Sequence, residues 1–196
     1  ENMRHTLIIL FFSFVLQSVA AQSGDQVFEF LTLPSSARAN ALGGHTVSLV
    51  ERDPSLIFHN PALLGGEMDG MINLDYMNYI ADVNVGSALF TKAFRERGAW
   101  GAGVHYFHNG KFKGMDENNQ STGDFTASDI AVNGFFSYDL SERWRGGVSM
   151  KFLYSNYDIY TSLGVCFDAG LSYYNSEKEF SFGVVLKNIG AQLKPY

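Results

Sequence analysis

The chain has 196 residues, of which 46% are hydrophobic, 15% aromatic and 17% charged, with a formal net charge of −6. Average soluble domains carry about 25% charged residues, so this chain is charge-poor, but its mean hydropathy of −0.04 is not that of a helical membrane protein. The acidic balance argues against a nucleic-acid partner, since phosphate binding needs clustered Lys and Arg. A single cysteine, Cys166, excludes an intramolecular disulfide framework and a cysteine-rich zinc site.

Residues 1–21 have the pattern of a secretory signal peptide. A positively charged start, Met3-Arg4-His5, precedes an apolar run from Thr6 to Leu16 and the small residues Ser18-Val19-Ala20-Ala21. This run is shorter than the roughly 20 residues of a spanning helix. A buried core helix is the alternative, but it would be uncapped and wholly apolar. No comparably long apolar run follows Gln22, so a mature protein that enters a membrane would do so with strands.

Residues 22–69 do not alternate between apolar and polar side chains. Their Ala, Gly and Pro residues predict a compact unit of loops and short helices, which we expect to lie inside a barrel as a plug. The motif Asn60-Pro61-Ala62 is the candidate site in this unit. An Asn cap followed by a Pro with a preset backbone angle suits the start of a helix or turn, so its expected role is a structural contact of the plug.

Residues 70–196 alternate between apolar residues and small or polar ones, the period of a strand with two different faces. Seven antiparallel strands are predicted, at about 71–79, 83–94, 99–106, 130–138, 147–154, 163–173 and 180–187. One face is large and apolar, whereas the other is mostly Gly, Ser and Ala. Soluble sheets usually show more charge to water. An all-β transmembrane barrel is therefore favoured over a secreted β-sandwich.

The connections between the predicted strands also differ in length. Residues 95–98, 139–143 and 175–179 form short charged turns, whereas 108–127 is predicted to be a long loop. In bacterial barrels the short turns are periplasmic. Aromatic residues stand at all five outward positions nearest these turns: Trp100, Tyr138, Trp144, Tyr173 and Phe180. Because such rings prefer the headgroup level of a bilayer, these residues predict a girdle in contact with outer-membrane lipid.

The sequence offers no catalytic, cofactor or metal site. His105 and His108 are three residues apart on a strand and would point to opposite faces. No nucleophile elbow selects a Ser-His-Asp triad, and residues 116–119 lack the alternation of a calcium loop. Cys166 is interpreted as a small filler of the inner face. A wet or plug-contacting interior accounts for the polar residues expected on that face: Asn73, Asp75, Lys151, Asp168 and Lys187.

Four stretches in order carry a resemblance to a known family. They are residues 28–44, 53–64, 110–129, which read GKFKGMDENNQSTGDFTASD, and 186–196, which read LKNIGAQLKPY. Together they resemble the FadL-like outer-membrane barrels and, among these, the PorV/PorQ family of the type IX secretion system, with the PorQ branch the best match. The resemblance implies a fourteen-stranded barrel with an N-terminal plug, in the outer membrane of a Gram-negative, Bacteroidota-type bacterium.

The resemblance also implies a function without catalysis. Such a barrel is a scaffold in the cell-surface complex that attaches secreted cargo, with a PorZ-like surface protein and the PorU and PorV components as partners. A FadL-like transporter of hydrophobic compounds is the alternative, but the small and polar inner face favours the scaffold. Seven strands do not close a barrel, and bacterial single-chain barrels have even strand numbers. We therefore expect residues 70–196 to be the first half of the barrel of a longer protein.

Overall fold

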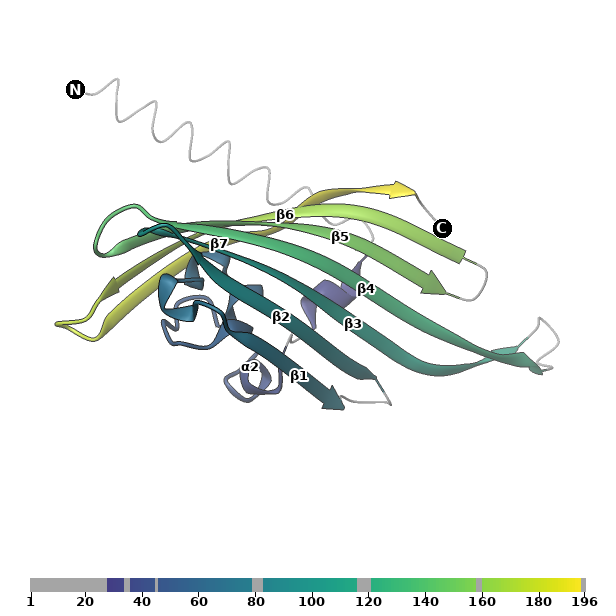
Figure 1. Ribbon diagram of the computed structural model, residues 1–196. Helices are drawn as coiled ribbons and strands as arrows, with labels where there is room; N and C mark the ends of the chain where they lie inside the picture. The colour runs from purple at the N-terminus through teal and green to yellow at the C-terminus, as the bar shows by residue number, and fades with distance from the viewer. Residues whose placement is uncertain are drawn as a thin grey trace, which may run out of the picture.

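The computed structural model describes residues 28–33, 36–44, 46–78, 83–115, 121–157 and 160–194. The signal peptide predicted for residues 1–21 lies outside these residues. The described chain is an all-β fold in which short helices precede one seven-stranded antiparallel sheet (Figure 1). No helix in the described part is long and apolar enough to cross a membrane.

The N-terminal segment, described from residue 28 to residue 69 with two short gaps, consists of one-turn helices joined by loops. These are η1 (Glu29–Thr32), α2 (Ala37–Ala41), η2 (Pro54–Phe58), η3 (Pro61–Leu63) and η4 (Gly66–Met68). Polar side chains begin several of them: Ser36 accepts a hydrogen bond from the backbone N–H of Ala39, and Asp53 accepts one from that of Ser55. Helices this short gain little from their own hydrogen bonds, so packing on the sheet must hold the segment.

The seven strands form a meander in which each strand pairs with the next one in the chain. They are β1 (Ile72–Asn78), β2 (Asn84–Phe94), β3 (Gly98–Met115), β4 (Ser121–Asp139), β5 (Trp144–Tyr157), β6 (Tyr160–Asn175) and β7 (Phe180–Lys194). Seven antiparallel strands were predicted from the alternation, and this prediction is confirmed. Within the described residues β1 pairs only with β2 and β7 only with β6, so the sheet has two open edges.

The region from 108 to 127 differs from its prediction. It was expected to be a long loop, but β3 continues to Met115 and β4 begins at Ser121, and the two strands stay paired along this stretch after a register shift between His108 and Lys111. Gly110 lies within the shift with φ of 78°, a conformation that glycine adopts readily. Backbone pairing does not need apolar side chains, so a polar composition misled the loop prediction. The hairpin extends beyond the neighbouring strands (Figure 1).

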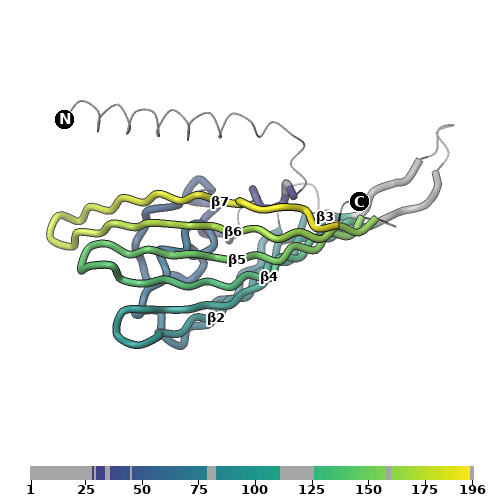
Figure 2. Tube along the Cα trace, turned by 90° about the horizontal axis from the view of Figure 1, so that it is seen from above, coloured from purple at the N-terminus to yellow at the C-terminus, as the bar shows by residue number. Residues whose placement is uncertain are grey.

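The two faces of the sheet have different surroundings. The sheet is curved, and the N-terminal segment lies against its concave face, as the side and top views both show (Figures 1 and 2). On β3 the outward residues Trp100, Val104 and Tyr106 are exposed, whereas Ala99 and His105 on the other face are buried. The alternation of the sequence therefore assigned the faces correctly.

The core lies between the segment and the concave face. In one cluster Phe30 of the segment packs with one residue from each of six strands: Met77, Val85, Phe107, Ala131, Leu153 and Cys166. In a second cluster four segment residues, Ile57, Phe58, Leu64 and Met68, pack with Leu89, Ala99 and Phe135. Both clusters combine residues of the segment with residues of the sheet, so the segment and the sheet share one core.

Candidate functional site

The predicted site residues lie on opposite faces of the sheet. Asn60, Pro61 and Ala62 are buried on the concave side, and the five aromatic residues of the predicted girdle lie on the convex side.

Asn60 both starts η3 and holds the loop before it. Its backbone is extended, and its Oδ1 accepts a hydrogen bond of 2.9 Å from the N–H of Ala62 at the start of the helix. Its Nδ2 donates to the carbonyl of Val47 at 2.8 Å. Pro61 occupies the first helical position, where a missing N–H leaves no bond unmade. A single buried amide thus fixes two parts of the segment relative to each other.

Two glycines of the sheet allow this turn to approach closely. Gly147 of β5 and Gly170 of β6 are paired directly across the two strands. The backbone of Pro61 and Ala62 occupies the space that a Cβ on Gly147 would take, and the side chain of Asn60 occupies that of Gly170. Only glycine allows so close an approach. Sequence reasoning found the motif but missed these partners; two inward glycines on adjacent strands were the available signal.

Further polar contacts tie residues 64–69 to three strands. The hydroxyl of Ser137 on β4 donates to the carbonyl of Leu64 at 2.6 Å, and that of Thr91 on β2 donates to the carbonyl of Met68 at 2.5 Å. On β5, Arg145 forms an ion pair with Glu67 at 3.1 Å. These bonds satisfy buried carbonyls that short helices leave open, so the segment is anchored along its length.

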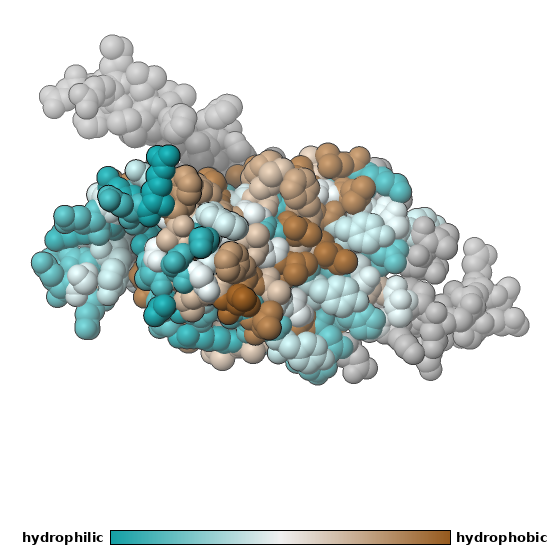
Figure 3. All heavy atoms as spheres, in the orientation of Figure 1, coloured by the Kyte–Doolittle hydropathy of each residue, from teal (hydrophilic) through white to brown (hydrophobic). Residues whose placement is uncertain are grey.

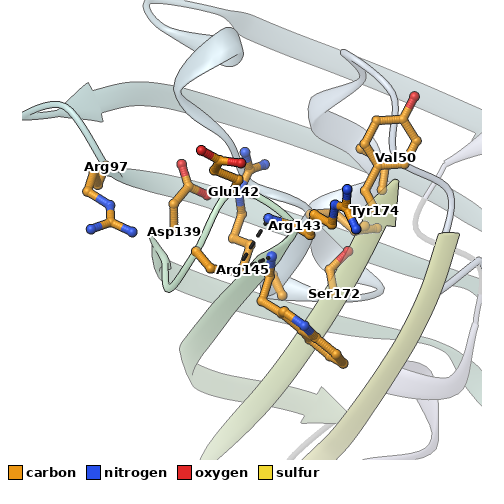
Figure 4. A pocket seen from close by; sticks show the side chains of 12 residues that line it. Val50, Arg97, Asp139, Glu142, Arg143, Arg145, Ser172 and Tyr174 are labelled. Carbon is orange, nitrogen blue, oxygen red and sulfur yellow. Dashed lines mark hydrogen bonds and ion pairs between the residues drawn. The ribbon is translucent and has the colours of Figure 1, made fainter. Parts of the chain in front are cut away.

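A cavity of about 500 Å³ lies between this segment and the short turns (Figure 4). Charged residues of both signs line it, among them Arg97, Asp139, Glu142, Arg143 and Arg145. The Arg145 guanidinium is bound on two sides, by Asp139 at 2.5 Å and by Glu67. In the described part of the chain no three His, Cys, Asp or Glu side chains come together as a metal site. The mixture of charges forms an ionic network between the segment and the turns.

A second polar cluster lies deeper on the concave face. The Lys151 ammonium is 2.7 Å from Asp168 Oδ2, which also accepts a hydrogen bond of 3.0 Å from the Ser149 hydroxyl. The other oxygen, Oδ1, accepts a bond of 2.8 Å from the backbone N–H of Asn188. Asn188 has a φ of 58° and lies where β7 carries a bulge opposite Asp168. The carboxylate therefore stabilises both a buried ammonium and a strand irregularity.

Other residues considered in the sequence lie outside this polar cluster. Asn73 and Asp75 lie on the open edge strand β1, away from this cluster, and Cys166 is buried in the apolar core. His105 is buried with its ring centroid 3.7 Å from that of Phe58, whereas His108 is only half-buried. The two histidines lie on opposite faces of β3, so the structure does not bring them together.

The outer aromatic residues form one continuous group and two separate contacts. The Trp144 and Tyr173 ring centroids are 4.9 Å apart, and those of Tyr173 and Phe180 are 6.3 Å apart. Trp100 packs against Phe90 at 5.8 Å, and the guanidinium of Arg97 lies 5.7 Å from the Tyr138 ring. All five predicted girdle residues thus stand beside the short turns, on β3 to β7.

The face of the molecule drawn in Figure 3 has a hydrophobic middle. Figure 3 shows hydrophobic side chains gathered in the central part of the molecule and hydrophilic ones at the end that carries the short turns. On the convex face the exposed large residues include Val132, Val148, Phe152, Val184 and Leu186. Soluble proteins rarely expose a contiguous apolar surface of this extent.

No protein-family model matches the chain, and comparison with curated proteins finds no significant match.

Proposed function

We propose that the chain forms the wall of a membrane-spanning β-barrel whose residues 22–69 are an internal plug, in the outer membrane of a Bacteroidota-type bacterium. The observation that carries this proposal is the character of the two faces: large apolar residues are exposed on the convex face, and many Ser, Gly and charged residues are buried beside the two apolar clusters on the concave face. A soluble sandwich buries its apolar face instead. Lipid is the surrounding in which such an outer face is stable.

The open edges support further strands in this barrel. Among the described residues β1 and β7 have no strand partner on one side, and in hydrocarbon each unpaired backbone group costs several kcal/mol. We propose that additional strands pair with both edges. The fourteen strands implied by the family resemblance are one such closed arrangement.

Within this barrel we propose a non-enzymatic scaffold function in the cell-surface cargo attachment complex of the type IX secretion system. The four stretches that resemble the PorV/PorQ family support it, and they imply a PorZ-like surface protein, PorU and PorV as partners. The β3–β4 hairpin adds a structural reason. It projects at the end opposite the short turns (Figure 1), which is the outer side in bacterial barrels, and it would be presented to a surface partner.

The alternative, a FadL-like transporter of hydrophobic compounds, needs an apolar passage between plug and wall. In the described residues the η3 backbone lies directly on Gly147, the Asn60 side chain lies on Gly170, and the cavity beside Lys151 measures only about 30 Å³. The larger cavity of about 500 Å³ beside the short turns is lined by charged residues of both signs, so neither space is an apolar passage, which favours a scaffold.

Fractionation of cells tests the membrane part of the proposal. The protein is expected in the outer-membrane fraction and should be released by detergent, because its apolar face contacts lipid. Release by high salt or alkaline carbonate alone would contradict a membrane-spanning barrel.

A gene deletion tests the scaffold function. We expect loss of surface-attached cargo together with normal uptake of fatty acids. A complementing variant in which residues 110–126 are replaced by a short turn should restore the protein in the membrane but not cargo attachment, whereas a matched double substitution of Ser141 and Glu142 in a short turn should restore both. Normal cargo attachment with lost uptake would favour the transporter.

A further inference from the structure

A small cavity on the concave face has an unusual lining. It measures about 30 Å³, more than the roughly 10–15 Å³ that a single water molecule needs, and lies where the segment residues Phe30 and Phe58 meet the sheet. Its polar lining consists of His59, His105, Asn133, Lys151 and Lys187. None of the described residues that line it is acidic, so the cavity is surrounded by cationic and neutral groups.

The charges around this cavity do not balance. Lys151 is neutralised by Asp168 at 2.7 Å and also donates to Asn188 Oδ1 at 2.8 Å. Both oxygens of Asp168 are occupied, by Lys151, the Ser149 hydroxyl and the Asn188 N–H. Lys187 has no ion pair or hydrogen bond with any other described residue. The positive charge of this half-buried ammonium therefore faces the cavity without a direct partner among the described residues.

His105 provides a second and independent indication. The residue is 7% exposed, and its Nε2 has no hydrogen-bond partner among the described residues. A buried nitrogen of this kind normally has a partner, either in the protein or in a bound molecule. His105 lines the same cavity as Lys187, although the two residues come from β3 and β7.

We propose that this cavity binds a monatomic anion of the size of chloride. One anion accepts a hydrogen bond from His105 Nε2–H and neutralises the Lys187 ammonium. A water molecule can accept the same hydrogen bond but carries no charge to neutralise the ammonium. The bound anion links β3, β5 and β7 to the segment through Phe30 and Phe58, so it fastens the plug to the wall.

Anomalous diffraction with bromide tests the site directly. Crystals of the full chain, purified in detergent and grown with sodium bromide, should show an anomalous peak between Lys187 and His105. The peak should disappear in Lys187→Met and remain in Lys178→Met, which removes an exposed lysine of the β6–β7 turn. An ordered water without anomalous signal in the parent protein would overturn the proposal.

Thermal unfolding tests the same site in solution. At constant ionic strength, replacing gluconate by chloride at about ten times its dissociation constant should raise the melting temperature by roughly 3–6 °C. Lys187→Met should lose this increase and Lys178→Met should keep it. His105→Phe, which keeps an aromatic ring but lacks the donor, provides a second variant should Lys187→Met fail to fold. Equal melting temperatures in both salts for the parent protein would contradict an anion site.

Discussion

Adding a single methyl group at Gly147 should weaken the packing of the N-terminal segment on the sheet. In Gly147→Ala the new Cβ would occupy the position of the Pro61 carbonyl carbon and the Ala62 nitrogen. These are backbone atoms and cannot rotate away as a side chain does, so η3 must shift. Overpacking of a close contact costs about 1–3 kcal/mol, and a shift of η3 also disturbs the two hydrogen bonds of the Asn60 side chain.

Gly134→Ala is the matched control. Gly134 lies on β4, and nothing is within 4 Å of a Cβ placed there; the substitution should be neutral, or stabilising by about 0.4–1 kcal/mol through the unfolded state. Both variants are compared in detergent by urea unfolding followed through tryptophan fluorescence and by limited proteolysis of residues 22–69. We expect lower stability and faster cleavage for Gly147→Ala alone. Equal stability and equal cleavage of the two variants would refute the close contact of η3 with β5.

Three further substitutions test the buried polar groups and the outer face. Asp168→Asn leaves the Lys151 ammonium buried without its carboxylate and should lower the free energy of unfolding by about 3–5 kcal/mol, while Lys151→Met combined with Asp168→Leu should recover most of it in urea titrations. Asn60→Ala removes the cap of η3 and the donor to the Val47 carbonyl, and should cost about 1–3 kcal/mol by the same measurement. Val132→Arg places a charge in the middle of the outer face and should cost about 2–4 kcal/mol in lipid vesicles, unlike Leu140→Arg in a turn; equal effects of these two would argue against lipid contact.

The alternating part of the chain could be predicted well because a strand has a fixed period of two. Once Trp100 and Val104 are assigned to one face, Ala99 and His105 must lie on the other, and the structure places them so. The same reasoning failed at residues 108–127, because glycine and polar residues are common in loops but do not prevent backbone pairing. Composition indicates where a turn is easy and does not forbid a longer ladder.

The site contacts could be predicted only in part. The sequence shows that Asn60 precedes Pro61 and so suits a helix start, since both features are local. It does not show that Gly147 and Gly170 face each other across two strands and receive that turn, because this depends on the register of β5 and β6 and on where the segment docks.

By itself the sequence determined the number of strands, their two faces and the non-alternating character of the segment before them, because all three follow from local periodicity. Only the tertiary structure decided that the segment lies on the concave face, that Lys151 and Asp168 neutralise each other there, and that Lys187 and His105 share one cavity. These contacts join residues far apart in the chain, and their distances are fixed by sheet curvature and docking, which no local pattern encodes.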